Sequence, residues 1–302
     1  MSEFMLQQTR VAMAIPYFHR WMERLPTLSA AAAAEPSTIL LLWSGLGYYA
    51  RARNLHHLCQ VLASLPTIPV EPAVWQRFPG VGPYTATAIL SLAGLMDAIP
   101  LDGNGLRILA RLVAAQGSFA NRSALERSLR PMADLLRIPG RCGAVGEALM
   151  DLGSSICLPA KPRCEICPIR PWCQLAGRPK EMPAPLPIRP RRREIIHRVW
   201  ICDGAVLWLQ RPMSGRLRHV FELPEIPSTA INRRSNSVLL QGMRTIGSVI
   251  YREIIYDGQN WPTMDQWQAV AIPELNSIPI SGPHRRWIRT ILERESELSP
   301  KN

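Results

Sequence analysis

Residues 78–86 of this 302-residue chain read FPGVGPYTA, and this stretch decides how the N-terminal half is built. Gly80 and Gly82 stand two positions apart, between two segments whose apolar residues recur at helical spacing. Glycine lets the backbone turn tightly and approach a ligand closely. The amide groups at the start of the next helix then point outward, where the helix dipole favours an anion. We therefore expect two helices joined by a short hairpin that can bind a phosphate.

Such a helix-hairpin-helix arrangement holds a DNA phosphate without reading the base sequence. A pair of glycines alone would fit an ordinary turn between helices equally well, but Pro79 and the helix pattern after the hairpin favour DNA. The net charge of +12 and the pI of about 10.0 also suit a polyanionic partner. The basic residues are spread along the whole chain, so charge alone is weak evidence.

Four of the seven cysteines fall within one stretch, CLPAKPRCEICPIRPWC at residues 157–173. They are Cys157, Cys164, Cys167 and Cys173, in a C-x6-C-x2-C-x5-C array. Thiolates this close together usually share a metal ion or an iron–sulfur cluster, because four soft ligands then converge on one centre.

The rest of the chain separates into a helical region, a linker and a mixed region. Helical periodicity predicts helices over residues 11–22, 30–43, 85–95, 106–115 and 144–152. The proline-rich and arginine-rich residues 177–194 read as an extended linker. Residues 197–212 predict two strands joined at Asp203-Gly204, residues 247–256 another strand, and residues 284–297 a final helix.

Targeting signals are missing from the sequence as written. Its start, MSEFMLQQTR, has no apolar core of signal-peptide length. No apolar run reaches the roughly 20 residues that span a bilayer. We therefore expect a cytoplasmic monomer with no membrane partner and with reduced cysteines.

Five motifs occur in a fixed order: SEFMLQQT (2–9), GLGYYARARN (45–54), FPGVGPYTA (78–86), LDGN (101–104) and the cysteine array. The chain resembles the MutY-type adenine DNA glycosylases of the endonuclease III superfamily. The resemblance implies a helix-hairpin-helix domain over residues 1–176, in two helical lobes with DNA and the active site in the cleft between them. It further implies the linker 177–194 and a smaller α/β, Nudix-like domain over residues 195–302.

The resemblance also implies the chemistry. The reaction would be hydrolysis of the N-glycosidic bond of adenine mispaired with 8-oxoguanine or guanine in double-stranded DNA. Glu3 would be the general acid, and Asp102 the carboxylate that stabilises the oxocarbenium ion and helps deliver water. Asn104 would orient Asp102, and Tyr84 would lie beside the sugar. Cleavage of a glycosidic bond needs one protonated and one ionised carboxyl group, and burial in an apolar pocket raises the pKa of the first.

Further positions match the DNA-binding and cofactor residues of this family. Gln8 and Tyr48 would wedge into the base stack so that adenine can be extruded, and Gly80 and Gly82 would hold a phosphate. The four cysteines match the ligands of a [4Fe–4S] cluster. Zinc is the alternative, but zinc sites usually come as two close pairs, and only Cys164–Cys167 is one.

A lyase activity is not expected. Bifunctional relatives carry a lysine just after the hairpin glycines for Schiff-base chemistry, and here that place is Tyr84. Another lysine follows the LDGN motif in some MutY-type proteins, and here that place is Leu106. We therefore expect a monofunctional glycosylase.

Residues 207–226, LWLQRPMSGRLRHVFELPEI, resemble the Nudix-like domain with which the family recognises 8-oxoguanine. The glutamate cluster of a Nudix box is missing, so pyrophosphate hydrolysis is not expected. The family's Phe-Ser-His loop is also missing. The nearest stretch, residues 244–249, reads RTIGSV and keeps only the serine.

The family has a further segment upstream of the Glu3 motif, and the present sequence reads as N-terminally truncated. A glutamate in the first turn of a terminal helix should fray, so we expect Glu3 to be exposed. We expect the chain as written to be weakly active or inactive, and a version extended upstream to be active. Two alternatives stay open: another mismatch or oxidised-base glycosylase of the superfamily, and a catalytically impaired DNA-binding iron–sulfur protein.

Overall fold

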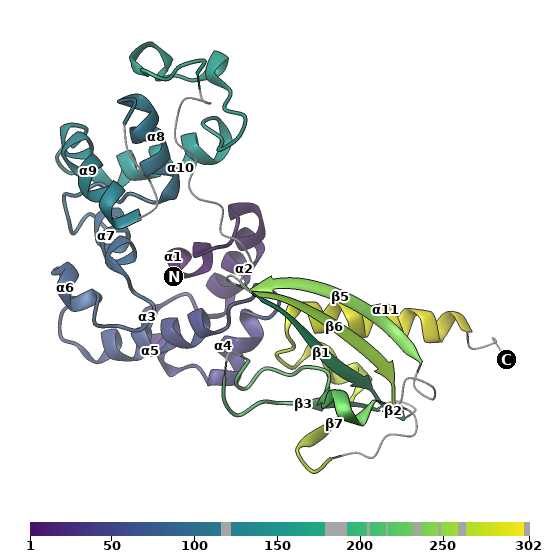
Figure 1. Ribbon diagram of the computed structural model, residues 1–302. Coiled ribbons are helices and arrows are strands. Elements are labelled where there is room, and N and C mark those ends of the chain that lie inside the picture. The colour runs from purple at the N-terminus through teal and green to yellow at the C-terminus, as the bar shows by residue number, and fades with distance from the viewer. Residues whose placement is uncertain are drawn as a thin grey trace. The chain divides into compact units, whose positions relative to one another are not determined.

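The computed structural model describes residues 1–115, 122–178, 192–203, 206–215, 217–231, 237–246, 249–258 and 264–298 (Figure 1). The chain divides into two compact units. Unit 1 combines residues 1–66 with residues 188–302, and unit 2 is residues 67–187. Most of the expected linker, residues 179–191, lies outside the described residues. The division into domains 1–176, 177–194 and 195–302 stays a prediction.

The first 66 residues form the helical part of unit 1. Its helices are α1 (Ser2–Leu6), α2 (Val11–Arg24), α3 (Leu28–Ala33), α4 (Pro36–Leu42) and α5 (Ala50–Ser64). The single helix expected over residues 30–43 is wrong, because the backbone is extended at Glu35 and Pro36 then opens α4. Phe4 of α1 and Trp43 after α4 are fully buried, and they anchor this part of the unit.

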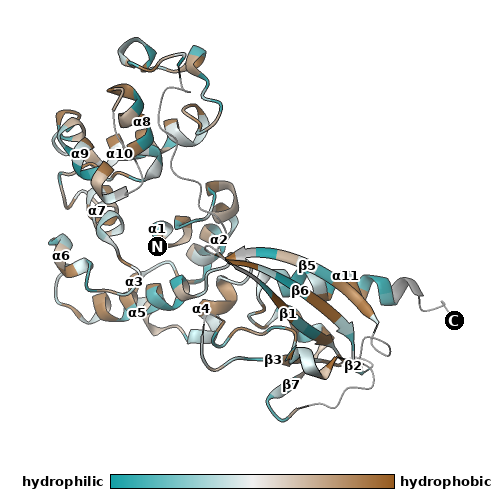
Figure 2. Cartoon of the chain, viewed as in Figure 1, coloured by the Kyte–Doolittle hydropathy of each residue, from teal (hydrophilic) through white to brown (hydrophobic). Residues whose placement is uncertain are grey.

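Two sheets build the remainder of unit 1. The first has the order β4 (Glu225–Ile226), β1 (Arg192–Trp200), β6 (Val249–Asp257) and β5 (Val238–Ile246). The second has the order β2 (Cys202–Asp203), β3 (Val206–Gln210) and β7 (Trp267–Ala271). Strands β1 and β6 are parallel, and the other pairs are antiparallel. Hydrophobic residues recur along β1 and β6 (Figure 2), as expected for strands that cover a core.

Helix α11 (Gly282–Leu298) supplies the other side of this core. Its Ile288 and Ile291 join one buried cluster with Leu207 of β3 and Ile255 of β6. Short 3-10 turns, η4 (Ser228–Ala230) and η5 (Ile272–Asn276), complete the region. Strands β2 and β3 pair antiparallel, but only Cys202 and Asp203 of the first predicted strand take part, because residues up to Trp200 belong to β1 in the other sheet. Gly204 of the expected turn lies outside the described residues.

Two hydroxyl groups tie the helical part of unit 1 to its sheet part. The side chains of Ser44 and Tyr49 both donate to the carbonyl oxygen of Ile280, at 2.8 and 3.0 Å. Gly45 and Gly282 pass so close that a Cβ atom on Gly282 would lie 3.2 Å from the Gly45 carbonyl oxygen. Glycine permits this approach, and the two parts therefore form one packed body.

The described residues of unit 2 form helices joined by loops. It contains α6 (Pro72–Trp75), α7 (Pro83–Leu92), α8 (Gly103–Leu112), α9 (Arg122–Leu135), α10 (Cys142–Ser155) and the turns η1 (Cys164–Ile166) and η2 (Arg170–Trp172). The core lies around α8, whose Leu106 and Leu109 are fully buried. Gly153 of α10 packs directly on Asn104, and a Cβ atom at Gly153 would collide with that side chain. The glycine thus brings α10 against the start of α8.

The described residues therefore comprise a mostly helical N-terminal region and a smaller C-terminal region that contains the sheets, as the sequence predicts. Each helix that the structure describes is too short or too polar to cross a bilayer.

Candidate functional site

The predicted hairpin lies between α6 and α7 in unit 2. Gly80 adopts a φ of +81°, a conformation that side chains disfavour, and Gly82 is the residue that precedes α7. Val81 is buried and its amide donates to the Phe78 carbonyl oxygen at 3.1 Å, so the turn is fixed from inside. Both glycines are exposed. The hairpin thus presents the positive end of a ten-residue helix at the surface, as an anion site requires.

Asp102 is held in one orientation at the start of α8. Its Oδ1 accepts a hydrogen bond from the Gly105 amide at 2.7 Å, so Asp102 caps the helix. Its Oδ2 accepts from the Asn104 side-chain amide at 2.8 Å. The structure therefore brings together two of the predicted catalytic residues, with Asn104 placed to orient the carboxylate.

Arg107 connects this carboxylate to the cysteine loop. One of its terminal nitrogens donates to Asn104 Oδ1 at 2.9 Å and to the Gly153 carbonyl oxygen at 2.7 Å. Its Nε donates to the Cys157 carbonyl oxygen at 2.9 Å. A continuous hydrogen-bonded path therefore runs from Asp102 through Asn104 and Arg107 to the first cysteine of the array.

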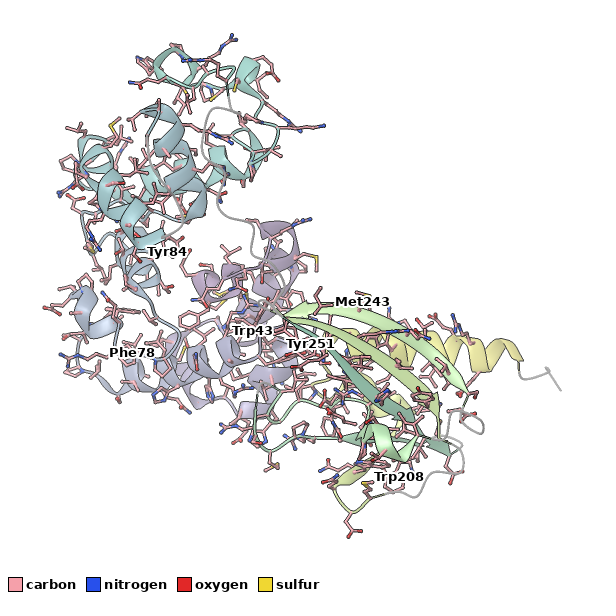
Figure 3. The ribbon with its side chains drawn as sticks, viewed as in Figure 1. Trp43, Phe78, Tyr84, Trp208, Met243 and Tyr251 are labelled. Atoms are coloured by element: carbon pink, nitrogen blue, oxygen red, sulfur yellow. The ribbon has the colours of Figure 1, made fainter. Side chains whose placement is uncertain are left out.

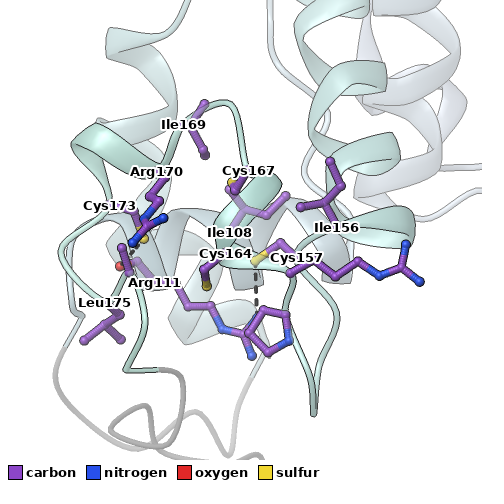
Figure 4. A pocket seen from close by; sticks show the side chains of 13 residues that line it. Ile108, Arg111, Ile156, Cys157, Cys164, Cys167, Ile169, Arg170, Cys173 and Leu175 are labelled. Carbon is purple, nitrogen blue, oxygen red and sulfur yellow. Dashed lines mark hydrogen bonds between the residues drawn. The ribbon is translucent and has the colours of Figure 1, made fainter.

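The four cysteines of the array line a single pocket in unit 2 (Figure 4). All four are free thiols. Burial raises the pKa of Cys173, and the neighbouring sulfurs of Cys157, Cys164 and Cys167 raise it further. Within the ranges that the structure describes, no three acidic, histidine or cysteine side chains are arranged to hold a single metal ion. The four thiols are thus gathered around one space.

Arg111 braces this pocket from α8. Its guanidinium donates to Cys157 Sγ at 3.2 Å and to the carbonyl oxygens of Leu158 and Pro159 at 2.8 and 2.7 Å. The Cys173 thiol in turn donates to the Arg111 carbonyl oxygen at 3.6 Å. A cationic group therefore lies within hydrogen-bond distance of the Cys157 sulfur at this wall.

Glu3 lies in α1 of unit 1 and is buried, with 8% of its surface exposed. The expectation that it frays into solvent is wrong. Burial lowers the pKa of the Met1 amino group, which interacts electrostatically with Cys59 and Glu3. The physical reason that α1 stays in place is Arg51, a buried residue of α5.

Arg51 binds the carboxyl end of α1 and the loop beyond it. Its guanidinium donates to the carbonyl oxygens of Phe4 and Met5 at 3.1 and 2.8 Å, to that of Gln7, and to Thr9 Oγ1 at 3.0 Å. It also donates to the carbonyl oxygens of Leu46 and Gly47 at 3.4 and 3.1 Å. Burial lowers the pKa of Arg51 to about 10, so the residue remains charged at neutral pH.

Gln8 and Tyr48, the two predicted wedge residues, flank this arginine. Both have a positive φ, +56° for Gln8 and +51° for Tyr48, in a region that non-glycine residues seldom adopt. Both side chains are exposed, and the Arg51 guanidinium stacks 5.3 Å from the Tyr48 ring centre. Strained backbone with exposed side chains is common at ligand-binding sites, and the Arg51 hydrogen bonds hold it here.

Gln8 and Tyr48 line one pocket of about 500 Å³ within unit 1. The sheet part contributes its other wall, including Leu217, Arg244 and Ile246. Arg244 and Ile246 begin the stretch that takes the place of the family's Phe-Ser-His loop, whereas Gly247 and Ser248 lie outside the described residues. The pocket therefore joins the predicted wedge residues to the region expected to recognise the opposite base.

Tyr84 lies in the first turn of α7 (Figure 3). Its hydroxyl group donates to the Met150 sulfur at 3.6 Å, and the side chain is half-buried. Glu3 belongs to unit 1, while Tyr84, Asp102 and Asn104 belong to unit 2. The catalytic roles of these four residues stay predictions.

Sequence reasoning missed the arginines that organise the site. Arg107 and Arg111 stand four residues apart on α8, directly after the LDGN motif, and this helical spacing could have placed both on one face. Arg51 lies inside the GLGYYARARN motif but has no local signal of burial. Arg244 also has no local signal of burial in the sequence, because the residues that it contacts come from other strands.

Comparison with known proteins agrees with these features. Residues 1–133 match the family of HhH-GPD superfamily base excision DNA repair proteins. An adenine DNA glycosylase of Schizosaccharomyces pombe is 44% identical over 177 residues, which cover 57% of this chain and 38% of that protein. The adenine DNA glycosylase of Mus musculus is 31% identical over 294 residues, which cover 80% of this chain and 56% of that protein.

A third relative, the adenine DNA glycosylase of Mycolicibacterium smegmatis, is 39% identical over 170 residues, covering 56% of this chain and 57% of that protein. The chain thus spans roughly two fifths to three fifths of the length of these curated relatives. A thermostable thymine-DNA glycosylase shares the fold, with a TM-score of 0.51 at 24% identity over 58% of this chain and 82% of that one. Over residues 1–133 the chain is thus similar to the HhH-GPD superfamily of base excision DNA repair proteins, and over part of their length it is similar to adenine DNA glycosylases.

Proposed function

We propose that this protein is a monofunctional adenine DNA glycosylase, which removes adenine mispaired with 8-oxoguanine or guanine from double-stranded DNA. The observation that carries the proposal is the orientation of the Asp102 carboxylate. Hydrogen bonds from the Gly105 amide and the Asn104 side chain fix it at the N-terminus of α8. The curated relatives are adenine DNA glycosylases, and the matched segment contains both proposed catalytic carboxylates.

The proposed reaction uses two carboxyl groups. Glu3 donates a proton to the leaving adenine as the bond between its nitrogen and C1′ of the sugar breaks. The Asp102 carboxylate stabilises the positive charge that develops on the sugar and accepts a proton from the water that adds to C1′. The products are free adenine and an abasic site.

We expect no lyase step, because two positions that carry a lysine in some relatives carry other residues here. Tyr84 follows the hairpin glycines where a bifunctional relative would place a lysine, and Leu106 follows the LDGN motif. Without an amine there is no Schiff base to break the strand, so the abasic product should persist until alkali is added.

Double-stranded DNA is the proposed partner. The hairpin at Gly80 and Gly82 would hold a phosphate at the start of α7. Gln8 and Tyr48 would enter the base stack from positions that Arg51 makes rigid. The sheet part of unit 1, proposed to be Nudix-like, would supply the second wall of a pocket for the base opposite adenine.

The four cysteines are proposed to bind a [4Fe–4S] cluster. The donor set fits, since four free thiols line one pocket that a cationic guanidinium also faces. Such a cluster, when bound, fixes the fold of its loop, and here that loop carries the basic residues Lys161, Arg163 and Arg170. Iron and sulfide content of the purified protein would separate a cluster from the zinc alternative, and Cys164→Ser should lower the iron content.

Release of free adenine tests the function. The protein is incubated with duplexes that carry adenine opposite 8-oxoguanine, adenine opposite guanine, thymine opposite guanine, or an oxidised pyrimidine, and the freed base is identified by chromatography. The proposal predicts free adenine from the first two duplexes and no base from the others. Release of thymine or of the oxidised pyrimidine would favour another glycosylase of the superfamily. DNA binding without any release would favour the catalytically impaired alternative.

A further inference from the structure

The pocket of about 500 Å³ in unit 1 has a definite chemical character. Its lining includes the arginines Arg51, Arg244 and Arg286, and among the residues that the structure describes it contains no acidic side chain. Apolar side chains, among them Leu217 and Ile246, line the same space. An apolar wall suits the flat face of a base better than a phosphate group, and guanidinium groups suit a base that presents oxygen acceptors.

Arg244 is the lining arginine that the sheet itself holds in place. Its Nε lies 2.5 Å from Oε1 of Glu253 on the neighbouring strand. Its guanidinium also lies 5.9 Å from the ring centre of Tyr251, the residue of β6 that pairs with Arg244 (Figure 3). Only 16% of the Arg244 side chain is exposed. The guanidinium is therefore confined to one orientation at the pocket wall.

The carboxylate that holds Arg244 is itself rigid. Glu253 is completely buried, and its Oε2 lies 3.4 Å from Arg198 Nε and 3.5 Å from His284 Nε2. The other ring nitrogen of His284 accepts a hydrogen bond from the Leu223 amide at 3.0 Å. Burial alone would raise the pKa of Glu253, but the nearby His284 and the positive charges of Arg198 and Arg244 lower the pKa. The carboxylate thus stays ionised and keeps its hold on Arg244.

We propose that Arg244 is a specificity-determining residue that donates a hydrogen bond to a carbonyl oxygen of the purine opposite adenine, with Glu253 as its positioning residue. This inference rests on the proposed function and names the chemistry of its recognition step. Guanine and 8-oxoguanine share the O6 carbonyl group, and 8-oxoguanine adds a second one at C8. A fixed guanidinium, which only donates, would select these bases against a purine without a carbonyl group.

Binding measurements test the inference without requiring catalysis. Duplexes carry 2′-fluoro-2′-deoxyadenosine, which resists cleavage, opposite 8-oxoguanine, guanine or nebularine, a purine that has no carbonyl group. The variant Arg244→Met removes the donor and keeps an apolar stem of similar length. The matched control is Arg252→Met, since Arg252 lies on the adjacent strand, donates to Gln241 at 2.6 Å and is not among the pocket-lining residues.

We expect Arg244→Met to weaken binding to the 8-oxoguanine or guanine duplexes about 10- to 100-fold, as for loss of a charged hydrogen bond, and to leave nebularine binding near the wild-type value. A loss for 8-oxoguanine alone would identify its C8 carbonyl as the acceptor, and an equal loss for guanine would identify O6. Glu253→Gln should lower the same preference by a smaller factor.

An equal loss on all three duplexes would overturn the inference, because it would mean contact with a phosphate or a general loss of structure. The same loss in Arg252→Met would overturn it as well. Single-turnover excision separates the two proposals. Adenine release by the wild type together with unchanged opposite-base preference in Arg244→Met would refute the inference alone, whereas wild-type protein that binds none of the duplexes would refute both.

Discussion

Replacement of Arg51 by methionine should release α1, the helix that carries Glu3. The arginine donates to six acceptors, of which the carbonyl oxygens of Phe4 and Met5 belong to residues with no exposed surface. Helix α1 has five residues, so its last carbonyl groups have no partner within the helix. Each buried carbonyl group left without a donor costs about 1–3 kcal/mol, and two therefore cost about 2–6 kcal/mol.

Hydrogen exchange of a peptide that covers residues 2–9 measures this loss directly. A cost of about 2 kcal/mol means that α1 opens about 30-fold more often, and a cost of about 6 kcal/mol means a much larger increase. The control is Arg53→Met on the same helix, because Arg53 is half-buried and donates to the Arg218 carbonyl oxygen at 3.2 Å. Unchanged exchange in Arg51→Met, or equal acceleration in the control, would refute the reasoning.

Three more changes have defined outcomes. Asp102→Asn should slow excision by about 10²–10⁴-fold with little change in melting temperature, because asparagine also caps helices well; a large drop in melting temperature would contradict this. Arg107→Leu should destabilise unit 2 by about 2–6 kcal/mol in urea unfolding, since it leaves the Gly153 and Cys157 carbonyl groups without this donor. Unaltered unfolding would contradict the hydrogen-bonded path from Asp102 to Cys157. Burial lowers the pKa of His284 below its ordinary value of 6.5, so the unfolded chain binds the proton more readily. Stability should therefore be complete above about pH 6.5 and fall as the pH drops below it, and His284→Gln should remove that part of the dependence in urea midpoints at pH 7.5 and 5.5.

Local patterns in the sequence predict much of the fold. The helix expected over residues 284–297 is observed as part of α11, and the strand expected over residues 247–256 is observed largely as β6. Apolar periodicity works there because each element buries one continuous face. It fails over residues 30–43, where an alanine-rich run carries the pattern across the break that Pro36 imposes.

Hydrophobic periodicity does not predict contacts between residues that are distant in sequence. Ser44 and Tyr49 reach Ile280 across more than 230 residues, and these hydrogen bonds join the first helices to the sheet part. The buried group around Glu253 also depends on strand register, since Arg198 comes from β1 and Arg244 from β5. Register follows from the packing of whole strands, which single motifs do not encode.

The candidate site divides in the same way. Asp102 and Asn104 are two residues apart, so their hydrogen bond follows from a local turn, and the cysteine spacing likewise implies that four thiols share one pocket. Burial of Glu3 could not be predicted, because Arg51, which binds the carboxyl end of the same helix, lies 48 residues further along the chain. Local motifs therefore indicate which residues take part, and long-range packing decides how they are held.

Strand cleavage of a duplex with one adenine opposite 8-oxoguanine, assayed with and without alkali, tests the central claim most directly. The wild-type chain should give breaks at the adenine position only after alkali, and Asp102→Asn should give almost none. Breaks without alkali would contradict a monofunctional enzyme. Tight binding of the duplex without any alkali-sensitive site would contradict the proposed chemistry altogether.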